Sequence, residues 1–248
     1  GARPLSTNLF IEIVRIIKEV DFGVRRVPGT ALKNAQGDVI YTPPVGEAII
    51  RDKLANLEQF MHADDDLDPL VKMAVMHYQF EAIHPFEDGN GRTGRILNLL
   101  YLVERGLLDI PVLFLSRYII ANKAGYYEGL RGVTERQEWE PWVLFMLQAV
   151  ESTAQQTFDQ VTRIRVLMEQ VREQVQQQAP GIYSKDLIEV IFQHPYTKIQ
   201  FLVDSSIAKR QTASSYLQTL AGLGILRPSK QGREMYYIND ALFAELVK

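Results

Sequence analysis

Residues 84–95 read His84-Pro85-Phe86-Glu87-Asp88-Gly89-Asn90-Gly91-Arg92-Thr93-Gly94-Arg95, and the elements on either side depend on this stretch. Upstream, residues 69–82 carry apolar side chains at helical spacing, and Pro85 disfavours helical geometry for the residue before it. The spacing therefore predicts a helix that delivers His84 at its end. Downstream, residues 96–103 are mostly apolar and predict a second, buried helix. The expected layout is a helix, a glycine loop and a second helix.

The glycine loop and the start of the second helix predict a phosphate site. Free N–H groups and the positive dipole end at a helix start attract anions, and glycine lets the backbone approach them closely. Arg92 and Arg95 lie three residues apart, so they share a helix face where both can pair with phosphate oxygens. Asp88 adds an oxygen ligand that suits Mg²⁺, which takes its remaining ligands from water and phosphate. His84, with an ordinary pKa of about 6.5, can act as a general base.

Residues 84–95 resemble the Fic (filamentation induced by cAMP) motif, H-x-F-x-[D/E]-G-N-G-R-x-x-R, at every fixed position. The resemblance implies a protein adenylyltransferase, or AMPylator, a nucleotidyltransferase that moves AMP from ATP to a Tyr, Ser or Thr hydroxyl of a target protein. It implies that His84 deprotonates the acceptor hydroxyl and that Asp88 holds Mg²⁺. It also implies the nucleotide contacts, which are an anion hole of Gly89, Asn90, Gly91 and Arg92, with Arg95 at the γ-phosphate.

A hairpin is expected before the motif. Residues 31–41 contain two short β-like pieces around turn residues 34–38, and Pro43-Pro44 follows them. The residues alone also allow a surface excursion. In the Fic family, however, a hairpin at this place is the flap that holds the target protein as an added strand. We expect Val39, Ile40 and Tyr41 to dock the target.

Beyond the motif, the resemblance nominates Tyr127 as a nucleotide contact, although the asparagine common a few residues further on is not found here. Two other groups were weighed as metal sites. His77, Glu81 and His84 lie at spacings of four and three, but H-E-x-x-H does not match, and we interpret His77 as a packed helix residue. The run Ala-Asp-Asp-Asp at residues 63–66 is interpreted as a solvated loop.

Composition excludes several classes of protein. The 248 residues are 46% hydrophobic, enough for one substantial core and a smaller unit. A net charge of −3 gives no global attraction to nucleic acid, so a DNA contact would need a local basic patch. The chain has no cysteine, which excludes disulfides, thiolate zinc sites and cysteine nucleophiles. Charged residues break the apolar region 96–120 and no signal peptide is recognisable, so we expect a cytoplasmic protein without a membrane partner.

The expected fold class is mainly α. We predict a Fic catalytic domain over residues 1–178, with a helical core, a small β-hairpin flap and a linking helix that begins at Glu140-Pro141. Polar residues followed by Ala179-Pro180-Gly181 mark the end of that helix. Residues 179–248 are predicted to form a second, small α+β domain.

The second domain resembles a winged helix-turn-helix. Helices are expected near residues 184–192, 199–203 and 207–223, the last capped by Asp204-Ser205-Ser206, with an alternating hairpin over 226–238. The polar and basic residues that groove binding would need lie at the third helix and on the wing: Lys209, Arg210, Gln211, Thr212, Arg227, Lys230 and Arg233. Because winged helices also bind proteins, a protein partner is an equal alternative to DNA.

Two functions follow from these motifs. The chain is either the adenylyltransferase, or a DNA-binding transcriptional regulator whose core senses nucleotide with little transferase activity. Since sensing requires no proton removal, the presence of His84 favours the enzyme. ATP and a protein are then the substrates and Mg²⁺ the cofactor, while the target protein and a homodimer are left open.

The resemblance also bears on inhibition. Fic proteins resemble one another in an inhibitory helix, [S/T]-x-x-x-E-[G/N], whose glutamate pairs with the second motif arginine, here Arg95. In this sequence only Thr134 has a glutamate four positions on, Glu138, and Trp139 follows it in place of Gly or Asn. We therefore expect an inhibitory segment upstream of Gly1 or in a separate partner, and Arg95 free for phosphate.

Overall fold

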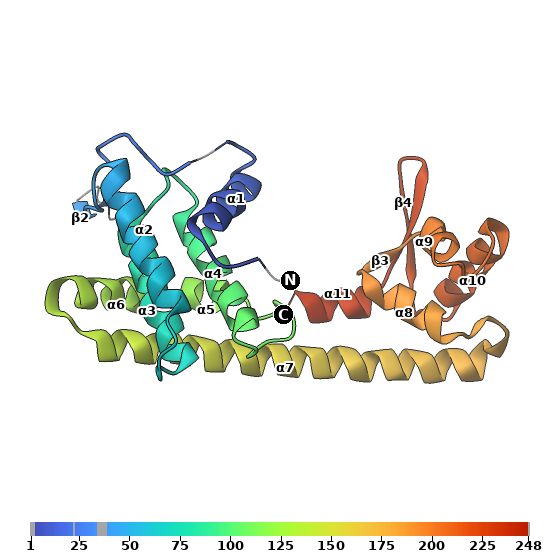
Figure 1. Cartoon of the computed structure of the whole chain (residues 1–248). Coiled ribbons are helices and arrows are strands. Elements are labelled where there is room, and N and C mark those ends of the chain that lie inside the picture. The colour runs from blue at the N-terminus through green and yellow to red at the C-terminus, as the bar shows by residue number, and fades with distance from the viewer. Residues whose placement is uncertain (1–2, 22, 34–38, 248) are drawn as a thin grey trace. The chain divides into compact units, whose positions relative to one another are not determined.

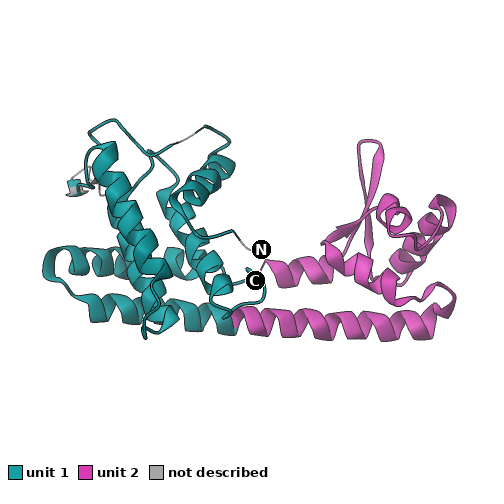
Figure 2. Cartoon of the chain, in the orientation of Figure 1, with its two compact units in different colours: residues 1–155 teal, residues 156–248 magenta. Residues whose placement is uncertain are grey.

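The computed structural model describes residues 3–21, 23–33 and 39–247 (Figure 1). The chain divides into two compact units, residues 1–155 and residues 156–248 (Figure 2). The division falls inside one long helix, α7 (Trp139–Gln178). The domain boundary proposed after residue 178 stays a prediction.

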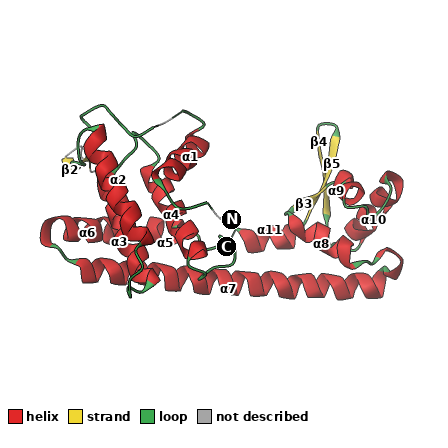
Figure 3. Cartoon of the chain, in the orientation of Figure 1, coloured by secondary structure: helices red, strands yellow, loops and turns green. Residues whose placement is uncertain are grey.

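The first unit is built from helices with one small hairpin (Figure 3). Its helices are α1 (Thr7–Lys18), α2 (Glu47–His62), α3 (Pro69–Ile83), α4 (Asn90–Glu104), α5 (Ser116–Ala121), α6 (Lys123–Arg136) and the first part of α7. The strands β1 (Leu32–Lys33) and β2 (Val39–Tyr41) pair antiparallel. This agrees with the mainly helical fold and the small hairpin expected from the sequence. The expected turn, residues 34–38, lies outside the described residues.

Local sequence sets the bounds of α3. Asp68 is its N-cap, with a side-chain oxygen that accepts from the Leu70 N–H at 2.8 Å, and Pro69 occupies the first turn, where no N–H is needed. At the other end the His84 N–H donates to the Phe80 carbonyl at 3.0 Å, and His84 adopts the left-handed conformation with φ 49°. The helix thus ends where Pro85 predicts.

Helices α3 and α4 pack together and carry the core of the first unit. Phe86, in the loop between them, is fully buried beside Phe80, which in turn meets Phe10 of α1 edge to face at 5.8 Å between ring centroids. Trp142 of α7 is also fully buried, and its indole N–H donates to the Ala74 carbonyl at 2.8 Å. Burying a Phe side chain stabilises a fold by about 1.5–3 kcal/mol. Phe80 at the end of α3 and Phe86 in the motif loop are both buried, so their packing fixes the loop to the helix before it.

The second unit contains the three helices and the hairpin that the sequence predicts. After the rest of α7 come a 3₁₀ turn (Pro180–Ile182), α8 (Lys185–Gln193), β3 (Tyr196–Thr197), α9 (Ile199–Asp204), α10 (Arg210–Gly222), β4 (Arg227–Gln231), β5 (Glu234–Ile238) and α11 (Asp240–Leu246). The strands form an antiparallel sheet in the order β3-β5-β4. The sequence reading missed β3 and α11.

The predicted start of the third helix was wrong. We expected Asp204-Ser205-Ser206 to cap a helix from residue 207, but α10 begins at Arg210 and Lys209 is its N-cap. Asp204 ends α9 instead, and Ser206 takes the left-handed conformation with φ 56°. The polar residues therefore make the turn between two helices, a use that Ser and Asp share with capping. Across the described residues, no helix is both long enough and apolar enough to cross a bilayer.

Candidate active site

The side chain of His84 is half-buried at the end of α3 and lines a pocket. Burial lowers the pKa of His84 below its ordinary 6.5, because the charged imidazolium loses hydration. The Glu81 carbonyl raises this pKa, Arg25 lowers it further, and Asp88 raises it, but burial dominates. The imidazole is therefore neutral near pH 7, the form that can accept a proton.

The motif loop is held by residues that point into it. Gly89, the N-cap of α4, has φ 86°, and a Cβ there would lie 3.0 Å from Cγ2 of Val14, so glycine is required on both counts. Asn90 is buried, and its amide bonds Phe86 twice: Oδ1 accepts from the Phe86 N–H at 2.9 Å and Nδ2 donates to the Phe86 carbonyl at 2.7 Å. The Asn90 side chain thus shapes the loop. A nucleotide contact from Asn90 stays a prediction, and its backbone is the part left to make one.

Asp88 lies at the entrance to α4 with its carboxylate 60% exposed. One oxygen forms an ion pair with Lys18 of α1, and the other accepts from the Gly89 N–H at 2.6 Å. Lys18 is the main cause of the lowered pKa of Asp88. This pair could not be predicted from local sequence patterns, because 70 positions separate Lys18 and Asp88.

The residues near Asp88 suit Mg²⁺ bound together with a nucleotide. The described part of the chain has no group of three or more His, Cys, Asp or Glu side chains that could enclose a metal ion. Mg²⁺ commonly uses one or two carboxylates and completes its octahedron with water and phosphate oxygens. Asp88, ionised and exposed, fits that single-carboxylate arrangement.

A pocket of about 370 Å³ lies beside the loop, within the size range of small-molecule sites. Its lining brings together His84, Gly91, Arg95, Tyr127 and Tyr41, five of the residues singled out from the sequence. Asp88, Gly89, Asn90 and Arg92 are not part of this lining. The candidate base His84 and the second motif arginine, Arg95, therefore line the same pocket. Tyr41 of the hairpin and Tyr127 of α6 also line it.

Arg95 is held by a residue that the sequence did not reveal. Its Nε donates to the hydroxyl of Ser116, the first residue of α5, at 2.9 Å. In the described residues no carboxylate forms an ion pair with Arg95. Glu81 is the nearby acid, and burial raises its pKa to about 7 although the charge of Arg95 acts in the opposite direction. Its buried Oε1 has no hydrogen-bond partner among the described residues.

Two family models match different parts of this chain. Residues 4–102 match the Fic/DOC family model, and residues 167–242 match the model "Protein adenylyltransferase SoFic-like, C-terminal domain". The chain contains a Fic/DOC domain and a SoFic-like C-terminal domain. It is 36% identical over 81 residues to a probable protein adenylyltransferase of Aquifex aeolicus, which covers 33% of this chain and 25% of that protein.

A second relative is the protein adenylyltransferase fic-1 of Caenorhabditis briggsae, 29% identical over 140 residues, or 53% of this chain and 26% of that protein. The chain thus spans about a quarter of the length of these two relatives. Among solved structures, a Fic family protein from Desulfovibrio desulfuricans G20 matches 92% of this chain and 67% of its own, with a TM-score of 0.53 and 19% identity. That likeness shows a shared fold.

In the Fic domain, His77 is a packed residue, as interpreted. It is buried, its Nε2 lies 2.9 Å from the Tyr126 hydroxyl, and its ring stacks on Trp142 with 6.1 Å between centroids. Burial lowers its pKa to about 3, so it is neutral. In the acidic run, Asp65 pairs with buried Lys72 at 2.9 Å, while Asp64 and Asp66 are exposed.

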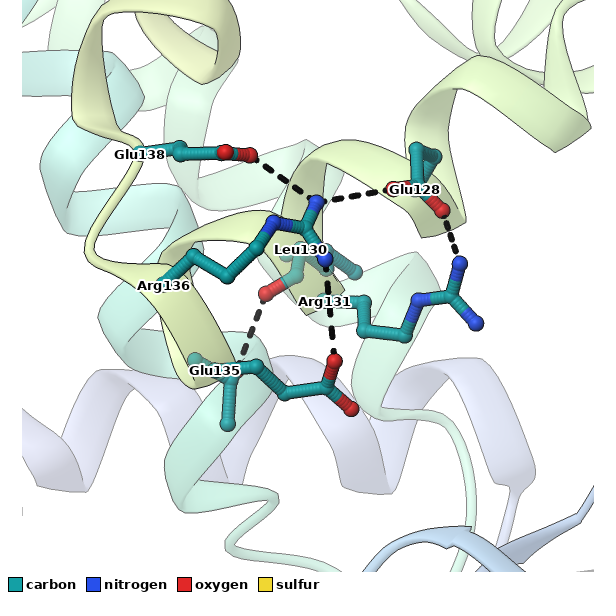
Figure 4. Close-up of polar contacts among 7 residues, drawn as sticks. Glu128, Leu130, Arg131, Glu135, Arg136 and Glu138 are labelled. Carbon is teal, nitrogen blue, oxygen red and sulfur yellow. Dashed lines mark hydrogen bonds and ion pairs between the residues drawn. The ribbon is translucent and has the colours of Figure 1, made fainter.

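Charged side chains of α6 and the residue Glu138 after it form a network of ion pairs (Figure 4). Two of them, Glu128 and Arg131, also line the pocket. Arg136 bonds Glu128 at 2.8 Å and Glu138 at 2.9 Å, and Glu128 also pairs with Arg131. Glu138 is the glutamate that follows Thr134 by four positions, and its partner is Arg136 rather than Arg95. This fits the expectation that the Thr134 segment is not an inhibitory helix.

The hairpin of the Fic domain is anchored to α3, the helix that ends at His84. The Tyr41 hydroxyl donates to the Ala82 carbonyl of α3 at 2.8 Å. The neighbouring Val39 is 55% exposed and free to meet another chain. The side chain of Ile40 lies outside the described residues, and docking by all three stays a prediction.

In the SoFic-like domain, the residues nominated for DNA are exposed. Lys209, Arg210, Gln211 and Thr212 lie at the start of α10, and Lys230 and Arg233 lie on the hairpin. Arg227 differs, because its Nε and one terminal nitrogen donate to the two oxygens of the Asp240 carboxylate, at 2.6 and 2.8 Å. Its charge is thereby balanced within the domain. DNA contact by all seven stays a prediction.

Proposed function

We propose that this chain transfers AMP from ATP to a Tyr, Ser or Thr hydroxyl of a target protein. The observation that carries the proposal is the pocket that places His84 beside Gly91 and Arg95. A base alone would allow many reactions, and an anion loop alone would allow simple nucleotide binding. Their convergence supports group transfer from a bound polyphosphate, the activity for which the relatives are named.

His84 would accept the proton of the target hydroxyl, since its lowered pKa keeps the imidazole neutral. The hydroxyl oxygen would then bond the α-phosphorus of ATP as the bond to the bridging oxygen breaks and pyrophosphate leaves. The N–H groups at the start of α4, with Arg92 and Arg95, would stabilise negative charge on the phosphates. When bound at Asp88, Mg²⁺ would neutralise further phosphate charge.

The hairpin would present the target hydroxyl to His84. An extended segment of the target would pair with β2, so that main-chain hydrogen bonds give affinity without one required sequence. Two observations support this. Among the described residues β2 pairs with β1 alone and Val39 is exposed, so the other edge of β2 is open to a target strand. The bond from the Tyr41 hydroxyl to the Ala82 carbonyl fixes β2 to α3, the helix that ends at His84. Tyr127, 55% exposed on the pocket wall, would contact the nucleoside.

The test is labelling of a cell lysate with ATP that carries the label on its α-phosphorus. The parent chain should label one or a few protein bands, and His84→Ala should lose this by about 10²–10⁴-fold, the usual contribution of general-base catalysis. His194→Ala, an exposed histidine in the other unit, is the matched control and should behave as the parent does. Equal labelling by His84→Ala and parent would refute the assignment of the base.

The exposed basic residues of the SoFic-like domain favour a second candidate, a DNA-binding regulator in which the Fic core reports nucleotide. It would need ATP binding but not His84. A His84→Ala chain that binds ATP and still controls a DNA site would favour this candidate over the enzyme.

A further inference from the structure

Arg25, on the segment after α1, is a buried cation without an acidic partner. Its residue is 3% exposed, and the described residues contain no ion pair to it. A charged side chain is seldom fully buried unless it is paired, because the charge loses hydration. The bonds of Arg25 therefore indicate what the fold uses this charge for.

Among the described residues, every hydrogen bond of the guanidinium goes to a main-chain carbonyl. Nε donates to the His84 carbonyl at 2.7 Å, and one terminal nitrogen donates to the Ile83 carbonyl at 3.4 Å and to the carbonyl of Pro44. The Arg25 N–H also donates to the Pro85 carbonyl at 2.9 Å. Arg25 thus bonds the main-chain carbonyls of three consecutive residues, from Ile83 at the end of α3 to Pro85 in the motif.

These bonds complete the end of α3. The last carbonyls of a helix lack partners within it, and the negative end of the helix dipole favours a cation. Tyr41 satisfies the Ala82 carbonyl, and Arg25 satisfies those of Ile83 and His84. Three successive carbonyls are thus bonded from outside the helix, where His84 holds a left-handed conformation that few residues other than glycine adopt.

We propose that Arg25 is a positioning residue for His84. It fixes the main chain of His84 and joins it to Pro44, which follows the hairpin strand β2, so that the imidazole and the edge that would present the target keep a set separation. The proposal rests on the proposed function only in taking His84 as the base. Arg25 itself touches neither nucleotide nor target.

The neighbouring residue supplies a matched control. Arg26 is exposed and pairs with Glu47 at 2.7 Å, away from the helix end. Arg25→Met removes the cation and its bonds, Arg25→Lys keeps the charge but cannot span three carbonyls, and Arg26→Met removes a charge one position along. Circular dichroism establishes first which variants fold.

The experiment joins NMR titration of the histidine ring protons with transfer kinetics. The chain has only four histidines, and His84→Ala assigns the resonance of interest. In Arg25→Met the pKa of His84 should rise, because a nearby positive charge that opposes protonation is gone, while Asp88 and the Glu81 carbonyl still favour it. The kcat should fall by about 10²-fold, the loss typical of a base displaced by roughly 1 Å, and the KM for ATP should stay near the parent value.

Arg26→Met should match the parent in both measurements. Arg25→Lys should keep the parent pKa and lose kcat, because charge remains and geometry does not. A parent kcat in folded Arg25→Met would overturn the proposal whatever the pKa of His84. If Arg25→Met does not fold, Arg25→Lys decides: a lowered kcat supports positioning, and an unchanged kcat overturns it.

The two proposals fail in different ways. If the parent transfers no AMP, the proposed function is wrong, but amide exchange at residues 82–84 and the pKa of His84 still report whether Arg25 holds this helix end. If the parent transfers AMP and Arg25→Met does so equally well, only the role of Arg25 is wrong.

Discussion

His84 accepts a proton only as neutral imidazole, and burial lowers its pKa below 6.5. The transfer rate should therefore rise with pH through a value below 6.5 and be level by pH 7, earlier than for an exposed histidine. Measurement of kcat/KM between pH 5 and 9 at saturating Mg²⁺ checks this. A rate that still climbs from pH 7 to 9 would show that a group of higher pKa is the base.

Glu81 is the second titrating group in the pocket, and its pKa is raised to about 7 by burial. The folded chain holds this proton more tightly than the unfolded chain, whose carboxyl titrates near 4.5. Stability from this group is complete below pH 4.5 and is lost as pH rises through about 7.

Glu81→Gln cannot lose a proton. Thermal melting of parent and variant across pH 4–8 should therefore show a stability difference that moves in favour of Glu81→Gln between pH 4.5 and 7 and is constant above. Parallel curves over that window would contradict the raised pKa.

At the scale of the elements, the loop between α3 and α4 depends on Asn90. Asn90→Ala would leave the N–H and carbonyl of Phe86 buried without partners, a cost of about 1–3 kcal/mol for each group. Urea unfolding should show a loss of roughly 2–4 kcal/mol, below the sum because the loop can relax. Asn122→Ala, which removes one exposed bond to the Tyr118 carbonyl, is the control and should cost under about 1 kcal/mol. Equal losses would mean that Asn90 does not hold the loop.

The same loop shows how much the sequence could predict. Pro85 acts on the residue before it, so the end of α3 followed from a local rule. Asp68 and Pro69 act just as locally at its start, although only the apolar spacing served to predict that start. His84, Gly91 and Arg95 of the motif line one pocket, whereas Asp88, Gly89, Asn90 and Arg92 do not, and the roles of all seven stay predictions. The beginning of α10 did not follow, because Ser and Asp serve turns and caps alike and only packing decides between them.

Long-range partners were beyond local rules. Arg25 and His84 are 59 positions apart, and Lys18 and Asp88 are 70 apart. The local sequence around Arg25 and Arg26 does not indicate that Arg25 is buried and Arg26 is exposed. The bond between Arg95 and Ser116 was likewise not predictable from the sequence, because it depends on where α5 packs.

At the scale of the molecule, the second unit offers a test of the regulator alternative. If it binds DNA, affinity should fall steeply with salt, and Lys209→Ala with Arg210→Ala should flatten the log–log slope by about one unit per lost phosphate contact. Arg172→Ala is the control, because this exposed arginine of α7 pairs with Glu169 at 2.6 Å and is not among the nominated residues, and its slope should match the parent. Full-length chain on duplex DNA over a salt series gives the measurement. Binding without salt dependence, or none, would assign the domain to protein recognition.

If His84 and the anion loop move AMP, the label on a modified protein must come from the α-phosphorus of ATP. The chain is incubated with lysate and ATP labelled either on the α- or on the γ-phosphorus, with His84→Ala in parallel. Relative to lysate without the chain, we predict added protein label from the α-labelled ATP alone, and about 10²–10⁴-fold less of it with His84→Ala. Added label from the γ-phosphorus, or α-label with His84→Ala equal to that of the parent, would show that this site does not transfer AMP.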